Sequence, residues 1–179
     1  MNKGVTVWFT GLSGAGKTTI SKEVERQLRN RNLNVEVLDG DVLRKHLTSD
    51  LGFSKEDRKQ NVRRAAYVAK LLTRNDVIVL ASFISPYEEM RRECREAIGS
   101  FVEVYVKCSI KECIRRDVKG LYKKALDGEI ERFTGITDPF EEPLNPEVTV
   151  HTDKETVEES AAKVITYLEQ NGYFSEEKS

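Results

Sequence analysis

A short segment near the start of the chain has the residue types needed to hold a row of phosphates. It reads Gly11-Leu12-Ser13-Gly14-Ala15-Gly16-Lys17-Thr18 and matches the pattern G-x-x-x-x-G-K-[ST] in full. Its glycines let the backbone turn tightly, so that successive N–H groups point inward at the phosphates. Lys17 is expected to reach the β- and γ-phosphates of ATP, and the Thr18 hydroxyl to bind Mg²⁺. The segment, extended by Thr19, therefore predicts ATP binding.

Two acidic residues, Asp39 and Asp41, follow the second apolar stretch of the chain. Ligands of a doubly wound sheet bind at the carboxyl ends of its strands, so both carboxylates are expected beside the phosphate-binding segment. Asp41 can bind Mg²⁺ through water, or accept or orient the proton of an attacking hydroxyl. The alternative is a turn of solvated acids, because Asp-Gly is a common turn sequence.

Two absences narrow the class of nucleotide-binding protein. No guanine-reading Asn-Lys-x-Asp motif follows the fourth apolar stretch, which disfavours a GTPase. The third stretch ends in Ser82-Phe83, so the usual Mg²⁺-binding aspartate is missing from that position. An acid after the second stretch instead suits an enzyme whose acceptor is a small hydroxyl compound.

The elements that must position these residues alternate along the chain. Buried strands are predicted over 5–10, 35–38, 77–81, 101–106 and 148–150, and the first helix over 17–30. Continuous apolar strands that are separated by helices indicate a parallel sheet covered on both faces. The expected fold is therefore α/β, a three-layer fold of the P-loop NTPase type with a five-stranded parallel sheet and a lid insertion.

Four further helices are expected to start where a hydroxyl residue precedes an acid by three positions. These starts are Ser54, Ser85, Ser109 and Thr152, and Pro86 would occupy a first helical position. In the helix after Ser54, apolar residues at helical spacing predict a buried stripe, formed by Val62, Ala65, Ala66, Ala69 and Leu72.

The segment 119–146 differs from the rest because it is rich in Lys, Gly, acids and proline, and holds three of the four prolines. A long insertion in a compact domain is more often a functional lid than structureless filler. We expect a single kinase domain over 1–174, with this segment as its lid, and a flexible tail over 175–179.

Composition fits one folded domain that acts on small molecules. The 179 residues are 39% hydrophobic and 33% charged. The net charge is −1, so the chain has no overall positive charge that would favour binding to nucleic acid. No apolar run approaches the ~20 residues that span a membrane, and the N-terminus lacks the form of a signal peptide. A cytoplasmic location is expected. The three cysteines are expected to be reduced thiols, because their number is odd and no CxxC pair occurs.

Taken together, these features resemble the adenylylsulfate kinase family from Val7 to about Asp153. Besides the phosphate-binding segment, the resemblance rests on Asp39-Gly40-Asp41 with Arg44, Leu51-Gly52-Phe53-Ser54, Asp57-Arg58 with Asn61 and Arg63-Arg64, Ser82-Phe83-Ile84-Ser85-Pro86, Arg116-Asp117-Val118-Lys119-Gly120-Leu121-Tyr122-Lys123-Lys124-Ala125, Phe133-Thr134-Gly135-Ile136 and Asp138-Pro139-Phe140-Glu141. It implies transfer of the ATP γ-phosphate to the 3′-hydroxyl of adenylyl sulfate (APS), giving 3′-phosphoadenylyl sulfate (PAPS) and ADP in sulfate assimilation. It also implies Mg²⁺ as cofactor and a homodimer.

The resemblance also implies a set of substrate contacts. Positions that match contacts to APS in the family are Asp41, Arg44, Phe53, Arg58, Asn61, Ile84, Ser85, Lys119, Arg132, Phe133 and Phe140. The residue chemistry agrees, since Phe53 and Phe140 can sandwich a base and two arginines can bind phosphate and sulfate oxygens as planar forks. The alternatives are core packing for the two aromatic rings and a solvated helical face for the basic residues near Lys59.

Ser85 matches a serine described as a phosphoenzyme site in the family. A helix cap and a backbone contact to substrate explain it as well, so direct in-line transfer, with Lys17 and Asp41 in catalytic roles, is the preferred mechanism. Arg115 or Arg116 is a candidate to stack on the ATP adenine. Two other functions stay open: a kinase for another small acceptor, such as a nucleoside, a sugar acid or shikimate, and a non-catalytic nucleotide-binding module.

Overall fold

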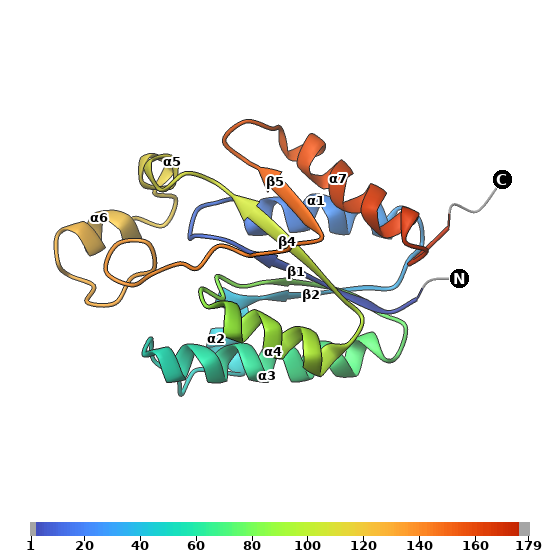
Figure 1. Cartoon of the computed structure of the whole chain (residues 1–179), viewed down its shortest axis with the longest axis horizontal. Coiled ribbons are helices and arrows are strands. Elements are labelled where there is room, and N and C mark those ends of the chain that lie inside the picture. Colours follow the sequence, from blue (N-terminus) through green and yellow to red (C-terminus); the bar gives the residue numbers. More distant parts are fainter. Residues whose placement is uncertain (1–2, 176–179) are drawn as a thin grey trace.

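All strands in the described part of the chain join one parallel sheet. The computed structural model describes residues 3–175, and the expected tail lies outside this range apart from Ser175. The strands are β1 (Val5–Thr10), β2 (Val35–Asp39), β3 (Ile78–Ser82), β4 (Phe101–Lys107) and β5 (Val148–His151), in the spatial order β2-β3-β1-β4-β5 (Figure 1). Each predicted strand is present, with ends that move by one residue at most, and every pairing is parallel.

Helices cover both faces of this sheet, which confirms the three-layer α/β fold. They are α1 (Lys17–Arg29), α2 (Gly40–His46), α3 (Lys55–Thr73), α4 (Glu88–Ile98), α5 (Ile110–Arg116), α6 (Leu121–Leu126) and α7 (Val157–Gln170). Figure 1 shows α1 and α7 on one face and α3 and α4 on the other, with α5 and α6 beyond the end of the sheet.

Strand β1 divides its side chains between two hydrophobic cores. Val7 and Phe9 pack into the core on the α1 and α7 side, whereas Trp8 packs into the core on the α3 and α4 side. This alternation is what a strand with both faces buried requires. The predicted stripe of α3 is present, since its valine and alanines are buried and Leu72 is partly buried in the second core.

Two of the four expected helix starts are present. The Ser54 and Ser109 side chains each accept a hydrogen bond from the backbone N–H three residues later, at the starts of α3 and α5. Each bond satisfies one of the backbone donors that the first turn of a helix leaves unpaired.

The expectations for Ser85 and Thr152 are wrong. Helix α4 starts at Glu88, so Pro86 lies outside it, and α7 starts at Val157 behind a capping box of Thr156 and Glu159. The Ser85 hydroxyl instead accepts from Trp8 Nε1 at 3.1 Å, and the Thr152 hydroxyl donates to the Ala15 carbonyl at 2.6 Å. Both side chains are used for tertiary contacts, which outweigh the local capping pattern.

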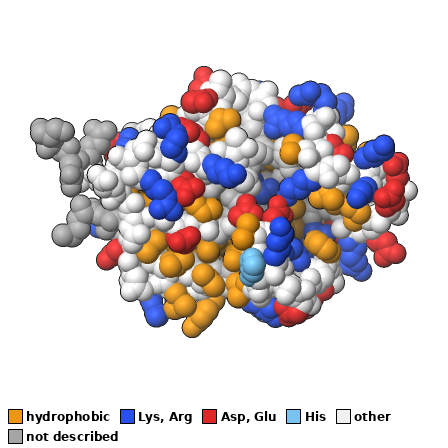
Figure 2. All heavy atoms as spheres, turned by 180° about the vertical axis from the view of Figure 1, so that it is seen from behind, with side chains coloured by type: hydrophobic (Ala, Val, Ile, Leu, Met, Phe, Trp, Pro, Cys, Tyr) orange, Lys and Arg blue, Asp and Glu red, His pale blue; other side chains and the backbone are white. Residues whose placement is uncertain are grey.

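The surface mixes charges of both signs. On the face shown in Figure 2, acidic and basic side chains are interspersed, and hydrophobic side chains gather toward the lower left. Within the described part of the chain, no helix combines the length and apolar character needed to cross a membrane. Cys94, Cys108 and Cys113 are free and buried, as their odd number predicted.

Candidate active site

The phosphate-binding segment forms a loop between β1 and α1, at the carboxyl end of the central strand. Gly16 caps α1 with a φ of 106°, a left-handed conformation that strains residues other than glycine. A side chain at Gly11 would place its Cβ 2.5 Å from the Val106 carbonyl oxygen. No side chain caps α1, so the N–H groups of its first turn are available to an anion.

Lys17 folds back onto this loop. Its Nζ donates to the carbonyl oxygens of Gly11 at 2.9 Å and Leu12 at 2.8 Å. Burial, and to a smaller extent the nearby Lys119 ammonium, lowers the pKa of Lys17 to about 8. A loop that holds a poorly solvated cation in this way gains stability when phosphate oxygens approach it.

The carboxyl end of β2 meets the start of α1. Asp39 ends β2 and caps α2, because its Oδ1 accepts from the Asp41 N–H at 2.9 Å, while its Oδ2 accepts from the Thr18 hydroxyl at 3.1 Å. Asp39-Gly40-Asp41 therefore starts a helix and does not form a free turn of solvated acids. Asp41 lies in the first turn of α2 and forms an ion pair with Lys119 of the segment 119–146.

This arrangement adds Asp39 to the residues expected to surround the metal, because Asp39, not Asp41, contacts the Thr18 hydroxyl. Hydroxyl and carboxylate oxygens are the donors that Mg²⁺ prefers, so the residues fit this ion. Among residues 3–175, no group of three or more His, Cys, Asp or Glu side chains could hold a metal ion alone. A magnesium ion at Thr18 would therefore need oxygens from the nucleotide, as is usual for this ion.

Arg44, Phe53 and Arg58 lie together beside the start of α3. The Arg44 guanidinium lies over the Phe53 ring, 4.3 Å from its centroid, and Arg58 Nε donates to the Phe53 carbonyl at 2.8 Å. The Phe53 side chain is 57% exposed, so core packing does not explain it. Burial lowers the pKa of Arg44, and the Arg58 charge lowers it further. Two guanidinium groups that repel each other at this place favour binding of an anion.

Arg58 and Asn61 share the buried face of α3, as their spacing predicted. Arg58 pairs with Asp138 at 2.9 Å and also donates to the Thr134 hydroxyl and the Arg132 carbonyl. Asn61 accepts from the Thr48 hydroxyl at 2.7 Å. Arg58 therefore ties α3 to the distant segment that contains the other candidate contacts, whereas Arg132 itself is exposed.

The candidate aromatic residues pack on different neighbours. Phe133 is buried and meets Tyr122 edge to face, with ring centroids 4.9 Å apart. Phe140 stacks on Tyr105 at 6.0 Å, and the Arg91 guanidinium lies 5.7 Å from its ring centroid. Phe53 and Phe140, the proposed base sandwich, thus have separate environments in this conformation.

Ser85 is buried and its hydroxyl is fully engaged. The hydroxyl accepts a hydrogen bond from Trp8 Nε1 and donates one to Thr10 Oγ1 at 3.0 Å. The Ser85 backbone has a φ of 40°. Thr10 in turn donates to the Ile84 carbonyl at 2.7 Å. A hydroxyl with these partners and 2% exposure is poorly placed to receive a phosphoryl group.

Tyr122 and Thr152, which the sequence did not assign to the site, support the phosphate loop, and Arg116, a candidate for the ATP adenine, holds Thr152. Tyr122 Oη donates to the Ser13 carbonyl at 2.7 Å, and Thr152 holds the Ala15 carbonyl. Arg116 donates to the Thr152 carbonyl at 2.8 Å, whereas Arg115 pairs with Glu112. Tyr122 and Arg116 lie in a stretch that carried the family resemblance, but their partners could be found only in the fold.

Comparisons with known proteins identify the family of this chain. The family model described as adenylylsulphate kinase matches residues 3–151. An adenylyl-sulfate kinase of Halothermothrix orenii is 64% identical over 97% of this chain and 94% of its own length. One of Rippkaea orientalis is 59% identical over 97% and 96%.

A solved structure gives the same answer. The Mycobacterium tuberculosis APS kinase CysC in complex with AMPPNP and APS superposes with a TM-score of 0.89 at 44% identity, covering 94% of this chain and 99% of that one. Together with the family match over most of the sequence, this likeness settles the classification. The chain belongs to the adenylylsulfate kinase family.

Proposed function

We propose that this chain transfers the γ-phosphate of ATP to the 3′-hydroxyl of adenylyl sulfate, giving 3′-phosphoadenylyl sulfate and ADP in sulfate assimilation. The proposal rests mainly on a contact between the phosphate loop and the end of β2. The Thr18 hydroxyl of the phosphate loop lies 3.1 Å from Asp39, two residues before Asp41. This contact brings the phosphate loop next to the start of α2, which carries Asp41, and phosphoryl transfer depends on holding donor and acceptor groups close together.

The ATP side of the site consists of the loop 11–19. Its backbone N–H groups and Lys17 hold the phosphates, and Lys17 stabilises the charge that grows on the terminal phosphate in the transition state. Thr18 and Asp39 would hold Mg²⁺ with the nucleotide, and Asp41 would do so through water. When bound, this ion would neutralise part of the phosphate charge.

The acceptor side consists of Asp41 and the residues around Phe53. Asp41 orients the 3′-hydroxyl and accepts its proton, and Lys119, its partner in this conformation, moves to an anionic substrate group. Arg44 and Arg58 bind the phosphosulfate, and Phe53 stacks on the adenine. Asn61, Ile84, Ser85, Arg132, Phe133 and Phe140 complete the contacts. Because the Ser85 hydroxyl is buried and engaged, we favour direct in-line transfer over a phosphoserine.

The segment 119–146, the lid, closes over the two substrates. Lys119 already crosses the site to Asp41, and Arg58 holds Asp138 near the end of the lid. Closure would exclude water, which competes with the 3′-hydroxyl for the phosphoryl group. The single domain over 1–174, the homodimer and the cytoplasmic location stay predictions.

Replacing Phe53 by alanine tests the acceptor side. The side chain is exposed, so stability should change little, whereas loss of a stacked base costs about 1–3 kcal/mol and should raise the KM for adenylyl sulfate about 5- to 150-fold. The KM for ATP should stay the same. Tyr67→Ala removes an aromatic ring of similar exposure, 63%, from within α3 and is the control. An unchanged KM in the Phe53 variant would remove Phe53 from the site.

The function itself is tested by ADP release from Mg-ATP in the presence of adenylyl sulfate, with the sulfated product identified by mass spectrometry. We expect release that depends on adenylyl sulfate and yields 3′-phosphoadenylyl sulfate. Nucleosides, gluconate and shikimate are run as competing acceptors. Faster turnover with one of these would replace the proposal by another small-molecule kinase, and ATP binding without any acceptor-dependent release would indicate a non-catalytic module.

A further inference from the structure

Arg91 is a fully buried guanidinium on α4 that lies outside the set of proposed substrate contacts. It is 1% exposed, although arginine is rarely buried without several partners. Its Nη1 donates to the Ser85 carbonyl at 2.6 Å, and its Nη2 donates to the Glu141 carbonyl at 2.6 Å and to Glu88 at 2.7 Å. Its Nε lies 3.5 Å from the carboxylate of the buried Glu103.

The first of these partners belongs to the acceptor side of the site. Ser85 has a φ of 40°, a region that residues other than glycine occupy only when their surroundings force them to. Hydrogen bonds to Trp8 and Thr10 fix its hydroxyl, and Arg91 fixes its carbonyl. The conformation of the Ile84–Ser85 segment therefore depends in part on Arg91.

The second partner belongs to the lid arm, which we define as residues 140–147. Around Arg91, the Glu141 N–H donates to the Pro86 carbonyl at 2.7 Å, and the Glu141 carboxylate accepts from the Glu88 N–H at 3.1 Å. The Phe140 ring lies beside the same guanidinium. One side chain thus joins the substrate segment after β3 to the end of the lid.

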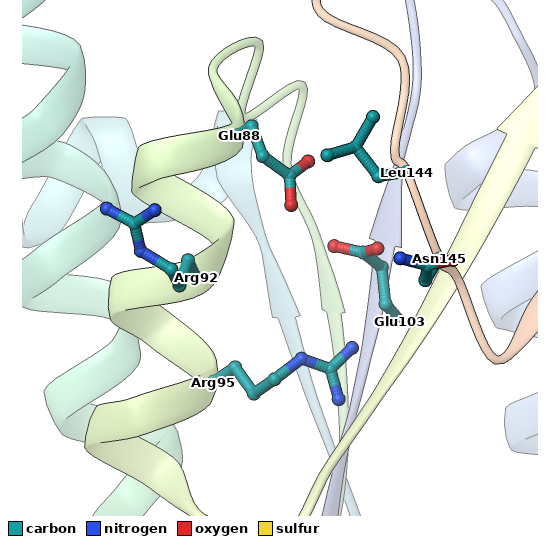
Figure 3. A pocket seen from close by; sticks show the side chains of 6 residues that line it. All are labelled: Glu88, Arg92, Arg95, Glu103, Leu144 and Asn145. Atoms are coloured by element: carbon teal, nitrogen blue, oxygen red, sulfur yellow. The ribbon is translucent and has the colours of Figure 1, made fainter.

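Polar links hold the lid arm to the body of the protein. At its far end Glu147 receives two hydrogen bonds from Arg95, at 2.6 and 2.9 Å, and one from the Glu103 N–H at 2.6 Å. Between the two ends lies a cavity of about 290 Å³, lined by Glu88, Arg92, Arg95, Glu103, Leu144 and Asn145 (Figure 3). Leu144 is 76% exposed, so apolar packing does little to hold the middle of the arm.

The charges explain why arginine is needed at this position. Burial raises the pKa of Glu103, and the Arg91 guanidinium opposes this shift. A planar fork with several N–H donors can serve two carbonyls and the Glu88 carboxylate, which lie in different directions, while its charge faces Glu103 at 3.5 Å without a hydrogen bond from Nε. A lysine keeps the charge but has one donor centre, so it cannot hold both carbonyls in place at once.

We propose that Arg91 is a positioning residue for the acceptor substrate: it fixes the Ser85 and Glu141 carbonyls relative to one another, so that the adenylyl-sulfate contacts and the lid arm come together in one geometry. The proposal rests on the proposed function for its substrate but not for its geometry. None of the hydrogen bonds or ion pairs that Arg91 forms within the described residues reaches the loop 11–19, so we expect its loss to act mainly on adenylyl sulfate.

Steady-state kinetics of Arg91→Lys and Arg91→Met test the assignment. Arg91→Lys keeps the buried charge and is the variant expected to fold. Because a hydrogen bond from a charged group is lost, the KM of Arg91→Lys for adenylyl sulfate should rise by about tenfold or more. Its KM for ATP should stay within about twofold of that of the parent. Arg92→Met removes a 63% exposed arginine from the same helix, and Arg95→Met releases only the far end of the lid arm. Equal rises in both KM values, or no rise, would overturn the proposal.

Amide hydrogen exchange gives a readout that needs no activity. In Arg91→Lys, the segments 84–87 and 140–142 should exchange faster together, while the loop 11–19 should not change. Unchanged exchange in either segment would count against Arg91. If the parent protein releases no ADP with adenylyl sulfate, the proposed function fails, but coupled exchange in the two segments would still support the positioning role.

Discussion

Replacement of Asp41 by alanine is expected to lower kcat by about 10²- to 10⁴-fold, the range for loss of a group that handles a proton in the transition state. Binding of ATP should be largely retained, because the loop backbone and Lys17 hold the phosphates. Helix α2 should also persist, since Asp39 supplies its cap. Turnover is measured by coupled ADP release, and ATP affinity by calorimetry with a non-hydrolysable analogue.

Two further variants make this result specific. Glu36→Ala removes an exposed acid from β2, the strand that leads to Asp41, and should leave turnover unchanged. Asp39→Ala removes both the helix cap and the Thr18 partner, so it should lose turnover and about 1 kcal/mol of stability together. If Asp41→Ala turns over as fast as the parent, Asp41 has no role in the reaction.

Replacement of Lys17 by methionine is expected to lower kcat by at least about 10²-fold, because a preorganised charge at the terminal phosphate is lost. The same change should alter how stability depends on pH. The pKa of Lys17 is about 8 in the folded chain, against 10.5 for an ordinary lysine. Between these values the unfolded state binds more protons than the folded state, so the contribution of Lys17 to stability rises with pH.

This contribution is measured as the difference in free energy of unfolding between Lys17→Met and the parent, in the absence of nucleotide. The difference should favour the methionine variant most below pH 8 and should shift toward the parent as the pH rises to 10. Lys22→Met, an exposed position on the same helix, is the control and should show no such trend. If the difference in free energy of unfolding between Lys17→Met and the parent does not change with pH, the Lys17 ammonium of the parent is not destabilised by burial.

The sheet was predictable from the sequence because short runs dominated by apolar residues alternate with helical patterns, which is typical of a parallel sheet covered on both faces. The helix starts were predictable only where the hydroxyl has no better partner. Ser54 and Ser109 cap helices, whereas Ser85 and Thr152 bind Trp8 and the phosphate loop. A local pattern cannot reveal a partner that is distant in the sequence, and this is why those two starts were wrong.

The residues of the site also differ in how far the sequence could predict them. A contiguous motif encodes the phosphate loop, so its residues could be named in advance. The contact between Thr18 and Asp39 depends on the sheet order, in which β3 lies between β1 and β2. The partners of Arg58 and Arg91 lie as far as 80 and 50 residues away in the chain. Nothing in the sequence near Arg91 distinguishes it from the exposed Arg92 beside it.

The segment 119–146, the proposed lid, is attached to the rest of the molecule on both sides of its most exposed stretch. Tyr122 binds the Ser13 carbonyl near one end, and Arg58 and Arg91 hold Asp138 and Glu141 near the other. Residues 127–132 between them are exposed apart from Ile130, which is partly so. A segment tethered twice bends in the middle when it opens and does not swing about a single hinge. Substrates should therefore enter, and products leave, past 127–132, while both anchors stay in place through the catalytic cycle.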